Sequence, residues 1–182
     1  AAPGLPMSRV SMDFNLADSS VTDALGEALA RALAGAAPAP GGHPGGVLYL
    51  QGDLGAGKTT CARSLLRALG VLGLVRSPTY TLVETYELAE LTCIHVDLYR
   101  LQSLTEVDEL GLRDLLGPSC LLLVEWPDRG GAALPPADLA VVLNYAGEGR
   151  QARVTAHSPL GSRWLENLGS DTSLRGYLSN LT

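Results

Sequence analysis

Residues 52–59 have the spacing of a phosphate-binding loop, G-x-x-x-x-G-K-T. The three glycines of this loop permit backbone turns that point successive N–H groups into one concavity, and a helix behind the loop adds partial positive charge at its start. Lys58 can reach the terminal phosphates of a nucleotide, and the Thr59 hydroxyl can hold Mg²⁺. An apolar strand at Val47–Leu50 precedes the loop and a helical pattern follows it, as this motif requires. We therefore predict a P-loop that binds a nucleoside triphosphate.

A P-loop needs a carboxylate that orders the magnesium and the attacking water, normally at the end of a buried strand. Glu125 and Asp97 both end such apolar segments. Burial of either carboxylate without a partner would cost several kcal/mol, and a divalent cation shared with Thr59 would offset that cost. We favour Glu125 as the metal-side acid because its strand is wholly apolar, with Asp97 orienting water or contacting the nucleotide indirectly. In the alternative interpretation, one of the two acids caps a strand end or pairs with Arg100.

Other nucleotide-binding classes leave patterns that can be checked. The Asn-Lys-x-Asp sequence that reads guanine is absent, so guanine specificity has no support. A small-molecule kinase should close an arginine-bearing lid over the donor phosphates. Arg100, Arg113 and Arg129 can serve in one, but no segment has the character of a lid. Trp126 directly follows Glu125, and it is either a core aromatic or a contact for a partner.

The elements that must position these residues alternate along the chain. Apolar spacing predicts a helix over Leu16–Leu33, capped by Ser19 or Ser20, and a second helix from Cys61 to Leu69. A third helix is expected over Leu104–Leu116, with Leu104, Val107, Leu112 and Leu115 on its buried side, and a last one in the tail from Ser162. Besides Val47–Leu50, strands are expected at 79–86, 92–97, 120–125, 139–143 and 153–156. This alternation predicts an α/β P-loop NTPase fold, three-layer α/β/α, with a largely parallel central sheet and additional antiparallel strands.

The length of 182 residues fits one domain with its own core. We expect an N-terminal extension prone to disorder over 1–15, a P-loop ATPase domain over 16–160 and a C-terminal tail over 161–182. The Gly/Pro/Ala tract over 34–46 reads as a flexible loop within the domain.

Composition excludes several classes of protein. Apolar runs such as Cys120–Val124 are far shorter than the ~20 residues of a membrane span. The net charge of −6 argues against autonomous binding to a nucleic-acid backbone. The three cysteines and three histidines are scattered, so they predict neither a zinc site nor a redox motif. Free thiols among apolar neighbours, together with the lack of a secretory pattern at the N-terminus, lead us to expect a cytoplasmic protein.

Four linked motifs resemble one bacterial family in their order along the chain. They are Gly52–Thr60, Ser77–Glu84, His95–Leu101 and Val124–Pro127. The family is TsaE (older name YjeE), the P-loop ATPase of tRNA threonylcarbamoyladenosine biosynthesis. The resemblance runs from about Leu16 to Ala156, and four linked motifs are far more specific than the phosphate loop alone. The tract before Val47 is longer than expected for the family, which lengthens a loop and can affect a partner surface.

The resemblance implies a function in concrete terms. Family members bind ATP with Mg²⁺, hydrolyse it slowly and join the TsaB–TsaD pair. They thereby support transfer of a threonylcarbamoyl group to the adenosine beside the anticodon of tRNAs that read ANN codons, with tRNA involved indirectly. Hydrolysis is then expected to reset the complex rather than to modify the tRNA.

The resemblance also implies roles for individual positions. Glu125, Asp97 and Lys58 would be the catalytic residues, and Thr59 with Glu125 would hold the magnesium. The phosphates would be bound by Leu54, Gly55, Ala56, Gly57, Lys58 and Thr59, with Asp97 at the nucleotide site. The base would be approached by Ser19, Gly149 and Arg150. A switch-like segment that senses the γ-phosphate would consist of Ser77, Pro78 and Thr79, and Trp126 would couple the site to a partner or to the nucleotide.

Two other functions fit the motifs taken singly. A P-loop kinase acting on a small metabolite would use the unassigned arginines and yield a phosphorylated product. A non-catalytic scaffold would assemble on nucleotide binding alone and would not need the acid at position 125.

Overall fold

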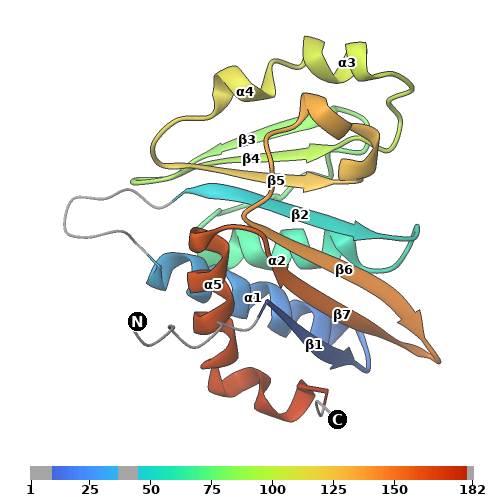
Figure 1. The fold of residues 1–182 in the computed structure, drawn as a ribbon, viewed down its shortest axis with the longest axis vertical. Coiled ribbons are helices and arrows are strands. Elements are labelled where there is room, and N and C mark those ends of the chain that lie inside the picture. Colours follow the sequence, from blue (N-terminus) through green and yellow to red (C-terminus); the bar gives the residue numbers. More distant parts are fainter. Residues whose placement is uncertain (1–9, 37–44, 180–182) are drawn as a thin grey trace, which may run out of the picture.

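The computed structural model describes residues 10–36 and 45–179. Within these ranges the chain forms an α/β fold of seven strands in one mixed sheet, five α-helices and three short 3-10 helices (Figure 1). The strands are β1 (Ser11–Leu16), β2 (Gly46–Gly52), β3 (Val83–Glu87), β4 (Thr92–Asp97), β5 (Cys120–Glu125), β6 (Leu139–Ala146) and β7 (Gly149–Ala156). The α-helices are α1 (Ser19–Gly35), α2 (Lys58–Leu69), α3 (Leu104–Glu109), α4 (Leu112–Leu115) and α5 (Pro159–Gly169). The 3-10 helices are η1 (Pro127–Arg129), η2 (Gly131–Ala133) and η3 (Thr172–Tyr177).

The sheet has a parallel centre and antiparallel flanks. Its strand order is β1-β7-β6-β2-β5-β4-β3, and the neighbours among β6, β2, β5 and β4 run parallel. The pairs β6–β7, β7–β1 and β4–β3 are antiparallel. Because β5 lies between β2 and β4, all six of its residues are buried, as its apolar sequence predicts.

The long first helix begins where a side chain satisfies its free amides. Asp18, rather than Ser19 or Ser20, is the cap: its carboxylate accepts hydrogen bonds from the N–H groups of Ser20 and Val21. The expected cap and start are therefore wrong by a few residues, and Leu16 belongs to β1. The apolar face is confirmed, since the residues spaced along it are buried, namely Val21, Leu25, Leu29 and Leu33.

Three other expectations differ from the structure. Residues 11–15 of the expected N-terminal extension form β1 together with Leu16, and this strand pairs with β7; residues 1–9 lie outside the described ranges. The helix expected over Leu104–Leu116 is broken into α3 and α4 by Gly111, whose φ is +64°. Leu104 and Leu115 are consequently exposed. The strand expected from Thr79 begins only at Val83, because Pro78 and Leu82 close a turn through a backbone hydrogen bond of 2.8 Å.

Apolar side chains form a core on each face of the sheet. The larger cluster joins the sheet to α1, α2 and α5, and α5 also packs against α1. The smaller cluster, on the face of Ile94, Val96 and Leu122, is covered by Val107 and Leu112 of α3 and α4 and by Leu134. Helical segments thus cover both faces, and the second layer consists of short pieces beside β3–β5 (Figure 1). In the described residues, no helix combines the length and the hydropathy that crossing a bilayer would require.

The close approach of α1 to α2 gives a stability prediction. A Cβ at Gly26 would lie 2.6 Å from the carbonyl oxygen of Cys61 and 2.7 Å from the Cβ of Ser64, so alanine there must force the helices apart. We expect Gly26→Ala to lower the free energy of unfolding by about 1–3 kcal/mol despite the better helix propensity of alanine. Thermal denaturation would measure this as a loss of roughly 2–4 °C per kcal/mol.

The matched control for this variant is Gly117→Ala. A Cβ at the exposed Gly117 would meet nothing within 4 Å, so its midpoint should stay close to that of the parent protein. Equal midpoints for Gly26→Ala and Gly117→Ala would contradict the close helix contact.

Candidate functional site

The glycine-rich loop, Gly52–Thr59, leads from β2 into α2 at the edge of the sheet where the parallel strands end. Asp97 and Glu125 are the last residues of β4 and β5, and they stand side by side in register at this edge. Ligands of open α/β sheets bind outside the carboxyl ends of the strands. A cavity of about 270 Å³ opens here, lined by the loop together with Thr79, Asp97, Tyr99, Arg100, Glu125 and Trp126.

The glycines of the loop have the conformations expected of them. Gly52, Gly55 and Gly57 have φ values of +142°, +78° and +108°. A Cβ at Gly52 would lie 2.3 Å from the carbonyl oxygen of Leu143, so β6 leaves no room for a side chain. No side chain of the described residues caps the start of α2 at Gly57, whereas Asp18 and Ser158 cap α1 and α5. The first amides of α2 are therefore free of a side-chain acceptor, which suits an anion.

Lys58 lies inside the loop, with only 5% of its surface exposed. Its Nζ donates hydrogen bonds to the carbonyl oxygens of Gly52 at 2.6 Å and Asp53 at 2.8 Å. Burial lowers the pKa of Lys58, and the carboxylates of Glu125, Asp97 and Asp53 oppose that shift. The cation is thus held by its own loop beside two carboxylates, where phosphate oxygens could replace the carbonyl acceptors.

Thr59 and Glu125 form the second feature of the site. The Thr59 hydroxyl donates to Oε1 of Glu125 at 2.9 Å, and the Glu125 side chain is 1% exposed. Asp97 is buried beside it and accepts a hydrogen bond from the N–H of Tyr99 at 2.9 Å. Burial raises the pKa of Asp97, and the negative charge of Glu125 adds to that rise. Neither acid forms an ion pair with Arg100 in the described residues, whereas the hydrogen bond from Tyr99 makes Asp97 a cap at the end of β4, which is the other half of the alternative interpretation.

The hydroxyl of Thr59 and the carboxylate of Glu125 are oxygen ligands of the kind that Mg²⁺ prefers. The described part of the chain has no cluster of three or more His, Cys, Asp or Glu side chains that would enclose a metal. Mg²⁺ is usually held by one or two carboxylates with water and substrate phosphates, rather than by an all-protein cage. A hydroxyl and a buried carboxylate 2.9 Å apart, next to free helix amides, fit Mg²⁺ that arrives with a nucleotide.

Trp126 belongs to this cavity. Its φ of +57° turns the chain sharply after β5, and its half-buried ring lies 4.9 Å from the ring of Tyr99. Lys58 Nζ is 4.4 Å from the centre of the Trp126 ring, within the range of a cation–π contact. Trp126 is therefore neither a fully buried core residue nor an exposed one, and it touches the lysine of the loop directly.

A second cavity, of about 200 Å³, lies on the other side of the loop. Ser19, Gly149 and Arg150, which were expected near a nucleotide base, line it with Asp18 and Thr22. Arg150 also donates to the carbonyl oxygen of Gly55 at 3.4 Å. Gly55, Gly57 and Thr60 line both cavities, so the loop separates two adjoining hollows.

The switch-like segment is only partly at the site. Thr79 lines the cavity beside Glu125, whereas Ser77 and Pro78 do not. The hydroxyls of Ser77 and Thr79 are hydrogen-bonded at 2.6 Å, so a movement of the Thr79 side chain would also move that of Ser77.

Several site residues were missed by the sequence analysis. Nε2 of His95 lies 2.7 Å from Oε2 of Glu125. From the sequence, this histidine is considered only as a possible metal ligand and as part of the motif His95–Leu101. Its position two residues before Asp97, on the same face of a strand, was the available signal. Tyr99 stacks on Trp126, and Tyr145 donates to the carbonyl oxygen of Leu54 at 2.7 Å. Tyr99 lies within the motif His95–Leu101 but had no role assigned to it, and none of the four motifs includes Tyr145.

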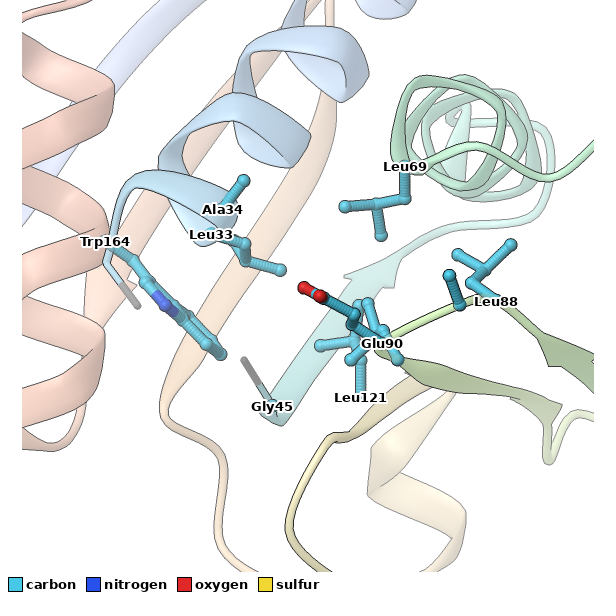
Figure 2. Close-up of a pocket in the computed structure, with 10 residues that line it drawn as sticks. Leu33, Ala34, Gly45, Leu69, Leu88, Glu90, Leu121 and Trp164 are labelled. Atoms are coloured by element: carbon cyan, nitrogen blue, oxygen red, sulfur yellow. The ribbon is translucent and has the colours of Figure 1, made fainter. Parts of the chain in front are cut away.

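A larger cavity, of about 400 Å³, lies at the opposite edge of the sheet, where β2, β4 and β5 begin. Figure 2 shows leucines from several elements and the ring of Trp164 around it, with the side chain of Glu90 reaching between them. Among the described residues that line it, Glu90 is the only ionisable one. The described part of this lining therefore lacks the groups that phosphate or metal chemistry needs.

Comparison with known proteins points to one family. The family model described as threonylcarbamoyl adenosine biosynthesis protein TsaE matches residues 16–154. A Haemophilus influenzae protein described as tRNA threonylcarbamoyladenosine biosynthesis protein TsaE is 44% identical over 115 residues, which cover 63% of this chain and 73% of that protein. A Bacillus subtilis protein of the same description is 36% identical over 137 residues, covering 75% and 84%.

The fold comparison agrees with the sequence comparison. The crystal structure of Bacillus subtilis YdiB matches with a TM-score of 0.68 and 28% identity, and the match covers 91% of this chain and 97% of that one. The residues matched by the family model include all four motifs, which confirms the resemblance.

Proposed function

This chain belongs to the TsaE family, and on that premise we propose that it acts in the biosynthesis of threonylcarbamoyladenosine in tRNA as a Mg²⁺-dependent P-loop ATPase. The single observation that carries the proposal is the Thr59–Glu125 pair, 2.9 Å apart beside buried Lys58 and the uncapped start of α2. A cation site next to an anion site of this kind suits the magnesium complex of a triphosphate.

The phosphates would bind at the loop, in place of the contacts that its own groups make. Lys58 would exchange the carbonyls of Gly52 and Asp53 for phosphate oxygens, keeping its hydrogen bonds while gaining a charged partner. The amides of residues 54–59 would donate to the same oxygens, because the glycine conformations and the helix start turn the backbone toward the cavity. The adjoining cavity at Ser19, Gly149 and Arg150 would take the adenosine.

Thr59 and Glu125 would hold the magnesium, which supplies charge stabilisation on the β- and γ-phosphate oxygens. Oε1 of Glu125 already accepts a hydrogen bond from Thr59, so this oxygen would need little reorganisation. Asp97 stands beside it at the end of β4 and would orient the attacking water. Burial raises the pKa of Asp97 from its ordinary value, and the negative charge of Glu125 adds to that rise.

We propose TsaB and TsaD as the partners, with tRNA reached through them rather than directly. The rim of the cavity supports a protein contact there: Tyr80 is 80% exposed, and the guanidinium of Arg100 lies 4.3 Å from its ring centre. Exposed tyrosine and arginine side chains are frequent anchors of protein interfaces. The link from Thr79 to Ser77 and the contact between Lys58 and Trp126 would connect the nucleotide to this rim.

The proposal is tested by calorimetry of ATP with Mg²⁺, followed by hydrolysis assays with and without TsaB, TsaD and tRNA. We expect ATP to bind, hydrolysis to be slow for the protein alone and faster with the partners, and modified adenosine to form over repeated rounds only when ATP is present. Absence of binding heat would refute the site. A phosphorylated metabolite, recovered after incubation with labelled ATP and metabolite pools, would point to a kinase instead.

A further inference from the structure

One buried contact at the site has no assigned role. The side chains of His95 and Glu125 are each 1% exposed, and Nε2 of His95 lies 2.7 Å from Oε2 of Glu125. His95 lies two residues before Asp97 on β4, so both side chains point to the sheet face that α2 covers. The second oxygen of Glu125, Oε1, accepts from Thr59. Both carboxylate oxygens of Glu125 are therefore in hydrogen-bond contact with another side chain.

The location of the histidine proton follows from the partners. An ionised carboxylate only accepts hydrogen bonds, so His95 must donate through Nε2–H. Its Nδ1 is buried and has no hydrogen-bond partner among the described residues. The contact with Glu125 therefore places a hydrogen on Nε2 of His95.

We propose that His95 is a positioning residue, which holds Oε2 of Glu125 so that Oε1 remains directed at Thr59 and the metal position. This inference rests on the proposed ATPase function. A glutamate side chain has three torsions, and a carboxylate held only through Oε1 could rotate away once Thr59 turns to the metal. Groups that hold a metal-binding carboxylate from behind typically contribute 10–100-fold to metal affinity or activity.

Three variants test the positioning role kinetically. His95→Leu removes the donor and keeps an apolar side chain in the buried position, and we expect its kcat for ATP to fall 10–100-fold with KM changed less than about threefold. His95→Gln can place an amide N–H near the position of Nε2 and should restore most of the rate. His157→Gln, at an exposed histidine, is the matched control and should behave like the parent protein. A His95→Gln variant as slow as His95→Leu, or a rise in KM with kcat unchanged, would overturn the role.

A measurement without ATP keeps this inference separate from the proposed function. Nitrogen-15 NMR of the histidine rings, assigned by loss of one ring in His95→Gln, should find hydrogen on Nε2 of His95. Glu125→Gln should move the His95 ring signals and leave those of His157 in place. A His95 ring without hydrogen on Nε2, or one that ignores Glu125→Gln, would refute the contact even if ATP is hydrolysed. Lack of ATP binding by the parent protein would instead refute the proposed function, and the positioning role with it.

Discussion

Replacing Lys58 by alanine is expected to weaken the binding of Mg²⁺–ATP about 100-fold. Lys58 is the only cationic side chain inside the glycine-rich loop. Its Nζ donates to the carbonyl oxygens of Gly52 and Asp53, which phosphate oxygens would replace. A charge-assisted hydrogen bond is worth about 1.5–3 kcal/mol, and its upper value corresponds to a change in Kd of roughly two decades. Isothermal titration calorimetry would measure the loss directly.

The control for Lys58→Ala is Arg67→Ala on the same helix. Arg67 is exposed in the last turn of α2, far from the loop, so its removal changes the net charge equally without touching the site. Its Kd should stay within about twofold of the parent value, because an exposed charge at that distance is largely screened. Equal weakening by the two variants would mean that Lys58 contributes only general charge, and unchanged binding by Lys58→Ala would contradict the phosphate site.

Replacing Glu125 by glutamine is expected to lower the rate of ATP hydrolysis about 10²–10⁴-fold, while the Kd for ATP changes only a few-fold. Glutamine keeps the shape of the side chain, and its oxygen can still accept from Thr59, but its amide nitrogen then faces Nε2 of His95 and removes the acceptor of that contact. It cannot carry the charge that the metal requires, so turnover suffers more than binding. Single-turnover hydrolysis and calorimetry on the same preparation would separate these two effects.

Two further variants sharpen this prediction. Asp128→Asn is the inert control, because Asp128 is exposed and bonds only to Gln51 at 3.0 Å. Asp97→Asn tests the choice between the two acids: a larger loss of rate there, with weaker magnesium dependence, would make Asp97 the metal-side acid. Full activity of Glu125→Gln in cells would favour the non-catalytic scaffold. Loss of activity in cells, with normal folding and ATP binding, would exclude it.

The chain itself determined the parts of the site that depend on local spacing. The glycine positions of the loop, the strand before it and the helix after it all lie within a dozen or so residues, and backbone sterics alone require glycine at positive φ. Strands β4 and β5 have the predicted bounds. The unbroken apolar run of β5 is typical of a strand buried on both faces, and β4 is interrupted between its ends only by His95. The last residue of each run was then a credible acid for the site.

Boundaries that depend on distant partners were not predictable in this way. Residues 11–16 alternate polar and apolar side chains, which is a local strand signal that the expected N-terminal extension overlooked; the sequence does not show their partner, β7, about 140 residues later. Gly111 divides the third expected helix because the chain there turns over the short second layer, a need that the periodicity of Leu104–Leu116 does not reveal. Secondary-structure propensity is weak compared with such tertiary pairing.

In the site, too, local sequence motifs determined some features and tertiary structure determined others. The sequence indicated Lys58, Thr59 and Glu125, since each stands at a fixed offset within its own motif. Only the tertiary structure decided that His95 grips Glu125 and that Lys58 faces Trp126, because the register of β4 against β5 and the turn after Glu125 set those distances. Local sequence specifies which groups a segment carries, whereas the pairing of strands and the packing of helices specify which groups meet.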